Sequence, residues 1–204
     1  MKKKLTILGI ILVAIALPFT QIITEMLTAQ TGPISEVREG DIIFQTSPSS
    51  QSPLIQLGTR SKISHCGVIV IRNNKPYVLE TLKTLVITPL DKFIARGVAG
   101  RYWIKRSKKE NVKISYRNYL GKPYDRSFKL DNNIYYCSEL VYDIYKKQLD
   151  IELCEPRKVS NYLILGTNHI PKIKREMKTR GITMKQKVIA PRDIFNSDEL
   201  EFVK

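Results

Sequence analysis

The chain has 204 residues, of which 43% are hydrophobic and 26% are charged, a composition that predicts one globular domain and excludes a disordered chain. Its 10 Gly and 10 Pro show no period, which excludes collagen-like and low-complexity architectures. The 34 Lys and Arg exceed the 19 Asp and Glu by 15, and 3 Cys are too few for a disulfide scaffold.

The first 30 residues predict a secretory signal peptide or an N-terminal membrane anchor. A basic start, residues 1–4, precedes an apolar run over residues 5–19, which is the order found in secretory signals. The run is shorter than the roughly 18–20 residues that span a bilayer. The nearest cleavage candidate is the segment Thr28-Ala29-Gln30. Under both alternatives we expect the globular domain, residues 35–204, to be extracytoplasmic.

Runs of β-branched and apolar residues predict strands in the first half of the domain. These strands are expected at 41–45, 64–71, 77–80 and 85–87. The polar segment 72–75 between the second and the third strand predicts a hairpin.

Helices are predicted between and after these strands. One begins at Ser52-Pro53 and another runs from Thr88-Pro89 to Gly97, because these residues favour helix starts and ends. A strand at 102–104, an amphipathic helix at 136–147 and a strand at 188–190 follow. Strands in succession between isolated helices predict an α+β fold with an antiparallel sheet.

Cys137 is a candidate nucleophile because it lies in the first turn of the predicted helix. A thiol at that position faces unpaired backbone N–H groups and the positive end of the helix dipole, which favour the reactive thiolate. The same N–H groups can donate hydrogen bonds to a developing oxyanion. The alternative is a small buried residue on the core side of the helix.

His65 and Glu80 are candidate partners of that thiol. If Asn73-Asn74 forms a two-residue turn, the numbers of paired residues sum to 147, and Glu80 is the diagonal neighbour of His65 on one face. If the turn is Arg72-Asn73, the sum is 145 and Glu80 lies directly opposite. Both registers let Glu80 orient an imidazole whose ordinary pKa of about 6.5 suits a general base. An odd-length loop would instead turn Glu80 to the other face, leaving a core histidine and an exposed glutamate.

The other two cysteines are not predicted to be catalytic. Cys66 follows His65 directly, so its side chain points to the opposite face of the strand, and we expect it in the core. Cys154 has no helix start or histidine near it in sequence. Because no C-x₂-C or H-x₃₋₅-H pair occurs, neither a metal nor another cofactor is predicted.

Four motifs together resemble the YiiX/YaeF group of the NlpC-type papain-like superfamily. They are Gly40-Asp41-Ile42-Ile43-Phe44-Gln45, Ser64-His65-Cys66-Gly67, Gly121-Lys122-Pro123-Tyr124-Asp125 and Tyr136-Cys137-Ser138-Glu139-Leu140-Val141. The resemblance implies a circularly permuted papain-like α+β fold, in which an antiparallel sheet or barrel packs against the cysteine helix. It also implies that the histidine strand precedes that helix, and His65 does precede Cys137, by 72 residues.

The resemblance further implies a cysteine amidase or peptidase with Cys137 as nucleophile, His65 as base and Glu80 as the group that orients the base. Tyr124 and Tyr136 are expected either to line the substrate cleft or to be ordinary half-buried aromatics. The implied substrates are amides in cell-envelope or lipid-linked material. An acyltransferase or lipid hydrolase with the same triad and a non-catalytic envelope-binding module stay open, and residues after Gln148 match no motif that identifies a substrate.

The C-terminal part of the domain concentrates positive charge. Residues 157–192 carry ten Lys and Arg against one acidic residue, Glu176. An anionic membrane or cell-wall surface is the expected partner, since each basic side chain near such a surface adds up to about 1 kcal/mol. A merely solvated face is the alternative. Nucleic acid is not expected, because only Tyr162 interleaves the basic residues.

Overall fold

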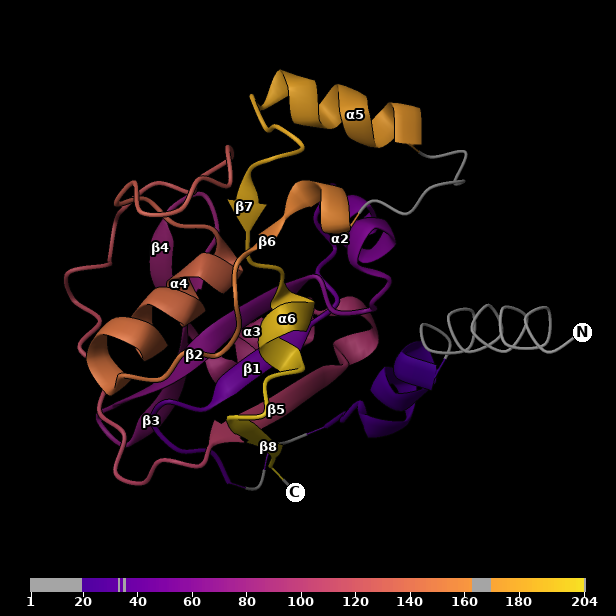
Figure 1. Cartoon of the computed structure of the whole chain (residues 1–204). Coiled ribbons are helices and arrows are strands. Elements are labelled where there is room, and N and C mark those ends of the chain that lie inside the picture. Colours follow the sequence, from indigo (N-terminus) through magenta and orange to yellow (C-terminus); the bar gives the residue numbers. More distant parts are fainter. Residues whose placement is uncertain (1–19, 33, 35, 163–169, 204) are drawn as a thin grey trace, which may run out of the picture.

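The computed structural model describes residues 20–32, 34, 36–162 and 170–203 (Figure 1). Most of the predicted signal segment, residues 1–19, lies outside the described residues. The described chain forms a sheet with helices on both of its faces, which is the α+β architecture that the sequence predicts.

The sheet is antiparallel and has the strand order β4-β3-β2-β1-β5-β8. Its edges are β4 and β8, so the predicted sheet is open, and the barrel form that was also considered is not found in the described residues. Two short strands, β6 and β7, pair separately. The strands are β1 (Ile42–Gln45), β2 (His65–Arg72), β3 (Lys75–Thr81), β4 (Leu85–Pro89), β5 (Tyr102–Ser107), β6 (Arg157–Lys158), β7 (Lys187–Val188) and β8 (Leu200–Phe202).

A two-residue turn sets the register between β2 and β3. Asn73 and Asn74 both have positive φ angles, 50° and 57°, as in the turns that best match the twist of a hairpin. Arg72 pairs with Lys75, and the paired numbers along the ladder sum to 147. The first of the two predicted registers is therefore confirmed.

Helices cover both faces of the sheet, as Figure 1 shows. On one face lie α4 (Cys137–Ile144) and α6 (Pro191–Phe195), and on the other lies α3 (Leu90–Arg96). α4 continues as a π-helical turn, η2 (Tyr145–Leu149), whose Tyr145 hydroxyl donates a hydrogen bond to the Gly40 carbonyl at 2.6 Å. This bond joins the far end of α4 to the residue that leads into β1.

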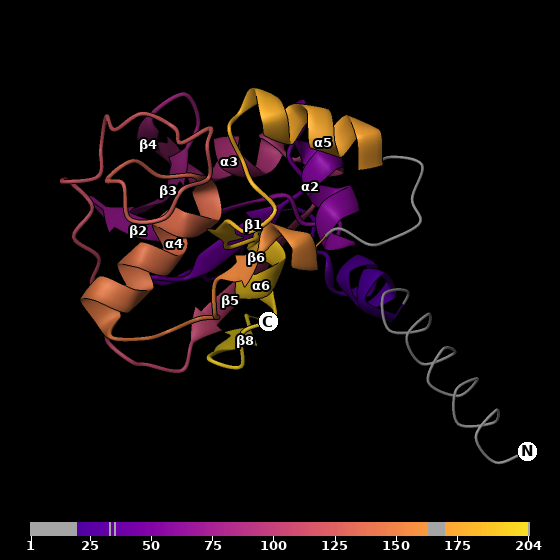
Figure 2. The ribbon, with the colours of Figure 1, turned by 45° about the horizontal axis from the view of Figure 1, so that its top comes forward.

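The remaining helices lie away from the centre of the sheet. α2 (Ser52–Thr59) and α5 (Ile170–Thr179) lie side by side in both views (Figures 1 and 2). Two short 3₁₀ turns complete the elements, η1 (Val98–Gly100) and η3 (Val159–Asn161).

Prediction and structure differ most after Gln148. Of the elements there, only the strand predicted at 188–190 has a counterpart, β7, which ends at Val188. α5, α6 and β8 were not predicted. β8 has three residues and α6 five, so neither is long enough to show a hydrophobic period.

A helix over residues 20–28 packs against the domain. Glu25 is fully buried, and its carboxylate accepts hydrogen bonds from the Ser61 hydroxyl and the Lys62 backbone N–H, both at 2.7 Å. Its backbone carbonyl accepts the indole N–H of Trp103 at 2.7 Å. Among the described residues, none of the helices combines the length and apolar composition needed to cross a bilayer.

We predict that Glu25→Ala lowers the free energy of unfolding by about 1–3 kcal/mol, because it leaves buried donors of Ser61 and Lys62 without an acceptor. Urea denaturation of the two proteins measures this difference. Glu36→Ala is the matched control, since Glu36 is exposed and pairs only with exposed Arg38. Equal effects of the two substitutions would contradict the prediction.

Candidate active site

Cys137 is the first residue of α4 and lies at the wall of a cavity. Tyr136 before it is extended (φ −98°, ψ 168°), so the chain enters the helix abruptly at the thiol. The first-turn N–H groups have no acceptor within the helix, and they point toward the same end as the thiol. Cys137 is 5% exposed and lines the cavity.

His65, the first residue of β2, is held by a carboxylate on the next strand. Its Nε2 lies 2.7 Å from Oε2 of Glu80, and its ring stacks on Phe93 with 5.7 Å between the ring centroids. The confirmed register makes the two residues diagonal neighbours, as predicted for the Asn73-Asn74 turn. Because Nε2 faces Glu80, Nδ1 is the nitrogen left for Cys137.

Gly67 allows β3 to approach β2 at this point. By the register, Gly67 lies opposite Glu80. A Cβ atom on Gly67 would lie 2.5 Å from a methyl carbon of Val78 and 2.7 Å from the Leu79 carbonyl oxygen. Glycine is therefore required here for close contact between strands rather than for a special φ angle.

Arg96 and Thr88 complete the surroundings of Glu80, and sequence analysis did not identify either. Arg96 donates to both carboxylate oxygens at 2.7 and 2.6 Å, and the Thr88 hydroxyl donates to Oε1 at 2.6 Å. Glu80 has no exposed surface. Thr88 could have been found by strand alternation, since Glu80 pairs with Val86 and Thr88 is two residues further on β4. Arg96 lies in the last turn of α3, and no sequence pattern links it to β3.

The thiol and the imidazole interact within this site. Burial disfavours the charged imidazolium, but hydrogen bonds with Cys137 and Glu80 outweigh it and raise the pKa of His65 to about 9. Hydrogen bonds from Cys66 and His65 hold the pKa of Cys137 well below its ordinary range, although burial opposes this. Burial opposes ionisation of Glu80 too, yet His65, Arg96 and Thr88 keep its pKa low. At neutral pH the resting pair is thus thiolate and imidazolium.

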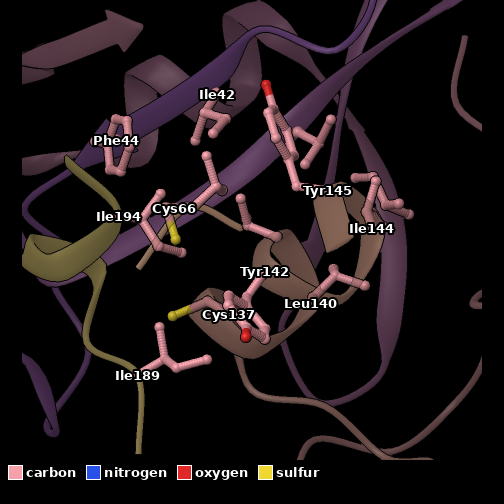
Figure 3. Packing of buried hydrophobic residues seen from close by; sticks show 14 of the residues in the cluster. Ile42, Phe44, Cys66, Cys137, Leu140, Tyr142, Ile144, Tyr145, Ile189 and Ile194 are labelled. Carbon is pink, nitrogen blue, oxygen red and sulfur yellow. The ribbon is translucent and has the colours of Figure 1, made fainter. Parts of the chain in front are cut away.

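Cys66 lies in the core as predicted, but it also contacts Cys137. It is fully buried and pairs with Phe44, on the face of the sheet that α4 covers. His65 pairs with Gln45 and faces α3. Strand alternation therefore separates the two side chains as expected. Both residues still act on the Cys137 thiol, and Figure 3 shows Cys66 and Cys137 on the same side of the sheet.

A cavity of about 170 Å³ opens beside the thiol, and mainly apolar side chains line it. Both candidate substrate-binding residues, Tyr124 and Tyr136, contribute to its wall. The Tyr124 hydroxyl donates to Gln51 at 3.2 Å, and the Tyr136 hydroxyl accepts the Ile189 backbone N–H at 3.0 Å. Other lining residues come from α2, α5 and the segment leading to α6: Leu54, Ile55, Ile173, Met177, Val188, Ile189 and Pro191.

Comparison with known proteins gives the family of this chain. A family model described as a permuted papain-like amidase enzyme, YaeF/YiiX, C92 family, matches residues 36–204. This chain belongs to that family. The protein YiiX of Escherichia coli strain K12 is 36% identical over 174 residues, which are 80% of this chain and 84% of YiiX.

A solved structure agrees with this relationship. The crystal structure described as the metalloprotein YiiX of Escherichia coli O157:H7 matches with a TM-score of 0.71 and 36% identity, covering 82% of this chain and 96% of that one. The permuted papain-like fold and the membership in a family of cysteine hydrolases, both implied by the motifs, are confirmed.

We predict different pH profiles for two reactions of this site. Alkylation of Cys137 should stay fast well below pH 8.5, the ordinary thiol pKa, because the thiolate persists there. The rate of hydrolysis, by contrast, should fall above about pH 9, because His65 then loses the proton that the leaving group needs. Mass spectrometry of the Cys137 peptide follows alkylation, and initial rates follow hydrolysis.

Glu80→Gln tests whether the pKa of His65 causes the fall in the rate of hydrolysis at high pH. Loss of the carboxylate should lower the pKa of His65 and move the fall in hydrolysis to lower pH. An alkylation midpoint near the ordinary thiol pKa in the unchanged protein would contradict the ion pair.

Proposed function

We propose that this protein is a cysteine amidase in which Cys137, His65 and Glu80 form the catalytic triad. The Cys137 thiolate attacks the carbonyl carbon of an amide, and the imidazolium of His65 donates its proton to the departing amine. His65 then takes a proton from water, which attacks the thioester and releases the acid. Glu80 keeps the imidazole oriented and stabilises its charged form. The observation that carries the proposal is the contact of the thiol with an imidazole that a buried carboxylate holds.

The start of α4 supplies stabilisation for the tetrahedral intermediate. The backbone N–H of Cys137 has no acceptor inside the helix, and the dipole of α4 is positive at this end. When Sγ attacks the carbonyl carbon, the carbonyl oxygen that becomes negative lies close to both. A donor placed in this way typically contributes a hundredfold or more to the rate, or about 2.7–4 kcal/mol.

The apolar cavity supports an acyl or lipid-linked substrate rather than a polar peptide. Leu54, Ile173 and Met177 line it on opposite sides, and Cys137 lies at its wall. An acyl chain in the cavity would place its carbonyl next to the thiol, and burial of each methylene would contribute about 0.8 kcal/mol. The same cavity favours a second candidate, an ester hydrolase or acyltransferase with the same triad, because acyl transfer from an ester uses the same covalent intermediate.

The reaction is derived from this chain's own side chains. The solved relative is described as a metalloprotein. Within the described residues of this chain, no group of three or more His, Cys, Asp or Glu side chains is arranged to hold a metal ion.

We predict that kcat/KM for N-acyl amides rises about fourfold for each methylene added to the acyl chain until the cavity is filled. Initial rates on a homologous series measure this. Met177→Ser should reduce the rate for long chains more than for short ones, because it removes apolar surface that lines the cavity. Cys137→Ala should abolish hydrolysis of all of them. Activity of Cys137→Ala would contradict the nucleophile, and rates independent of chain length would contradict the acyl-binding cavity.

We also propose that the protein is exported and keeps residues 20–30 in its mature form. Cleavage after Ala29 would remove Glu25 and leave the buried Ser61 hydroxyl and Trp103 indole N–H without their acceptors. Such losses cost about 1–3 kcal/mol for each group. Removal of this segment would therefore destabilise the domain.

The mass of the protein recovered from the envelope fraction tests this proposal. We expect the recovered chain to contain Glu25. Added protease should leave the protein intact in whole cells and degrade it after the outer envelope has been removed and the cytoplasmic membrane is still closed. A mature chain that starts at Gln30, or full-length protein in the cytosol, would contradict it.

A further inference from the structure

Cys66 is a buried nucleophilic group that the proposed reaction does not use. It is the second residue of β2, has no exposed surface and lies in the same core cluster as Cys137. Figure 3 shows both sulfurs directed into the space between β2 and α4, toward one another. Each thiol shifts the pKa of the other. Both are free in this structure.

The two thiols differ in their access to small molecules and in their ionisation. Cys137 lines the cavity, and the contact with His65 favours its thiolate, the form that oxidants attack. Cys66 is fully buried, and burial raises the pKa of its thiol well above the ordinary range. A small oxidant entering the cavity therefore reacts with Cys137 first.

We propose that Cys66 is a resolving cysteine, which forms a reversible disulfide with Cys137 after that thiolate has been oxidised by a peroxide. In the first step, the thiolate attacks one peroxide oxygen, the O–O bond breaks, and Cys137 becomes a sulfenic acid while the departing oxygen leaves as water or an alcohol. In the second step, the sulfur of Cys66 attacks the sulfenic sulfur. The S–O bond breaks, and the hydroxyl leaves as water with the thiol proton of Cys66. Two thiols are oxidised and one peroxide is reduced.

The positions of the two residues allow this bond to form. A disulfide requires sulfurs about 2.05 Å apart, closer than a hydrogen-bonded contact. Cys137 is the first residue of α4 and lines the cavity, and Cys66 lies in the same core cluster. The disulfide removes the nucleophile, and a dithiol restores it by exchange while being oxidised itself.

The consequence is protection of Cys137 against irreversible oxidation. Without a nearby thiol, a sulfenic acid in an open cavity reacts with more peroxide and becomes a sulfinic acid, which dithiols do not reduce. Cys154, the third cysteine, is partly buried before β6. It serves as the matched control, because it does not line the cavity that Cys137 lines.

The experiment exposes the full protein, Cys66→Ser and Cys154→Ser to hydrogen peroxide and then to dithiothreitol. An electrophilic thiol probe reports the reactive fraction of Cys137, relative to each untreated protein. We expect the unchanged protein and Cys154→Ser to lose labelling and regain it fully with the dithiol. Cys66→Ser should lose labelling and not regain it. Peptide mapping of the oxidised unchanged protein should show the Cys66 and Cys137 peptides joined.

Several results would overturn this proposal. They are recovery of Cys66→Ser equal to that of the unchanged protein, a linked peptide that contains Cys154, or a Cys66 that stays free after peroxide treatment. The test does not depend on hydrolysis of any substrate. A joined Cys66–Cys137 peptide in a protein that hydrolyses no amide would refute the proposed function alone.

Discussion

The ion pair between Glu80 and His65 is the interaction on which the site depends. Glu80 is fully buried, and a buried carboxylate is tolerated only when hydrogen bonds and opposite charges compensate its lost hydration. Here the compensation comes from β2, β4 and the end of α3, through His65, Thr88 and Arg96. The contacts that compensate the lost hydration of the Glu80 carboxylate also hold the His65 imidazole in one orientation. Stability of the sheet and orientation of the base therefore have one physical cause.

This arrangement explains why the thiol need not be ionised by a separate step. Glu80 stabilises the positive charge on His65, and His65 in turn stabilises the negative charge on Cys137. The raised pKa of His65 and the lowered pKa of Cys137 both favour transfer of the thiol proton to the imidazole. For the proposed reaction, the remaining structure supplies position: the cavity would hold the substrate, the first turn of α4 would face the oxyanion, and Gly67 allows the close approach of the two strands.

Sequence alone predicted the parts of this site that follow local rules. Counting from a two-residue turn gave two registers that both bring Glu80 within reach of His65, and the structure has the one with the turn at Asn73-Asn74. Alternation placed Cys66 in the core, but it could not show that α4 begins where both faces of β2 are within reach. The apolar wall on α5 was missed although Ile173 and Met177 have helical spacing. Arg96 reaches Glu80 through a contact between elements distant in sequence, which no period or motif records. The short C-terminal strand and helix were missed for the same reason, because packing rather than propensity defines them.

The hydrogen bond from Tyr145 to the Gly40 carbonyl has a consequence for the nucleophile at the opposite end of α4. Eight residues separate Tyr145 from Cys137, so the two side chains lie about 12 Å apart along the helix axis. An α-helix is stiff in compression, and a clamp at one terminus prevents its other terminus from sliding along the sheet. The hydrogen bond of the Tyr145 hydroxyl thus fixes the position of the Cys137 sulfur relative to the start of β1, although Tyr145 does not line the cavity. The position of the proposed nucleophile therefore depends on packing at the far end of the helix as well as on its immediate neighbours.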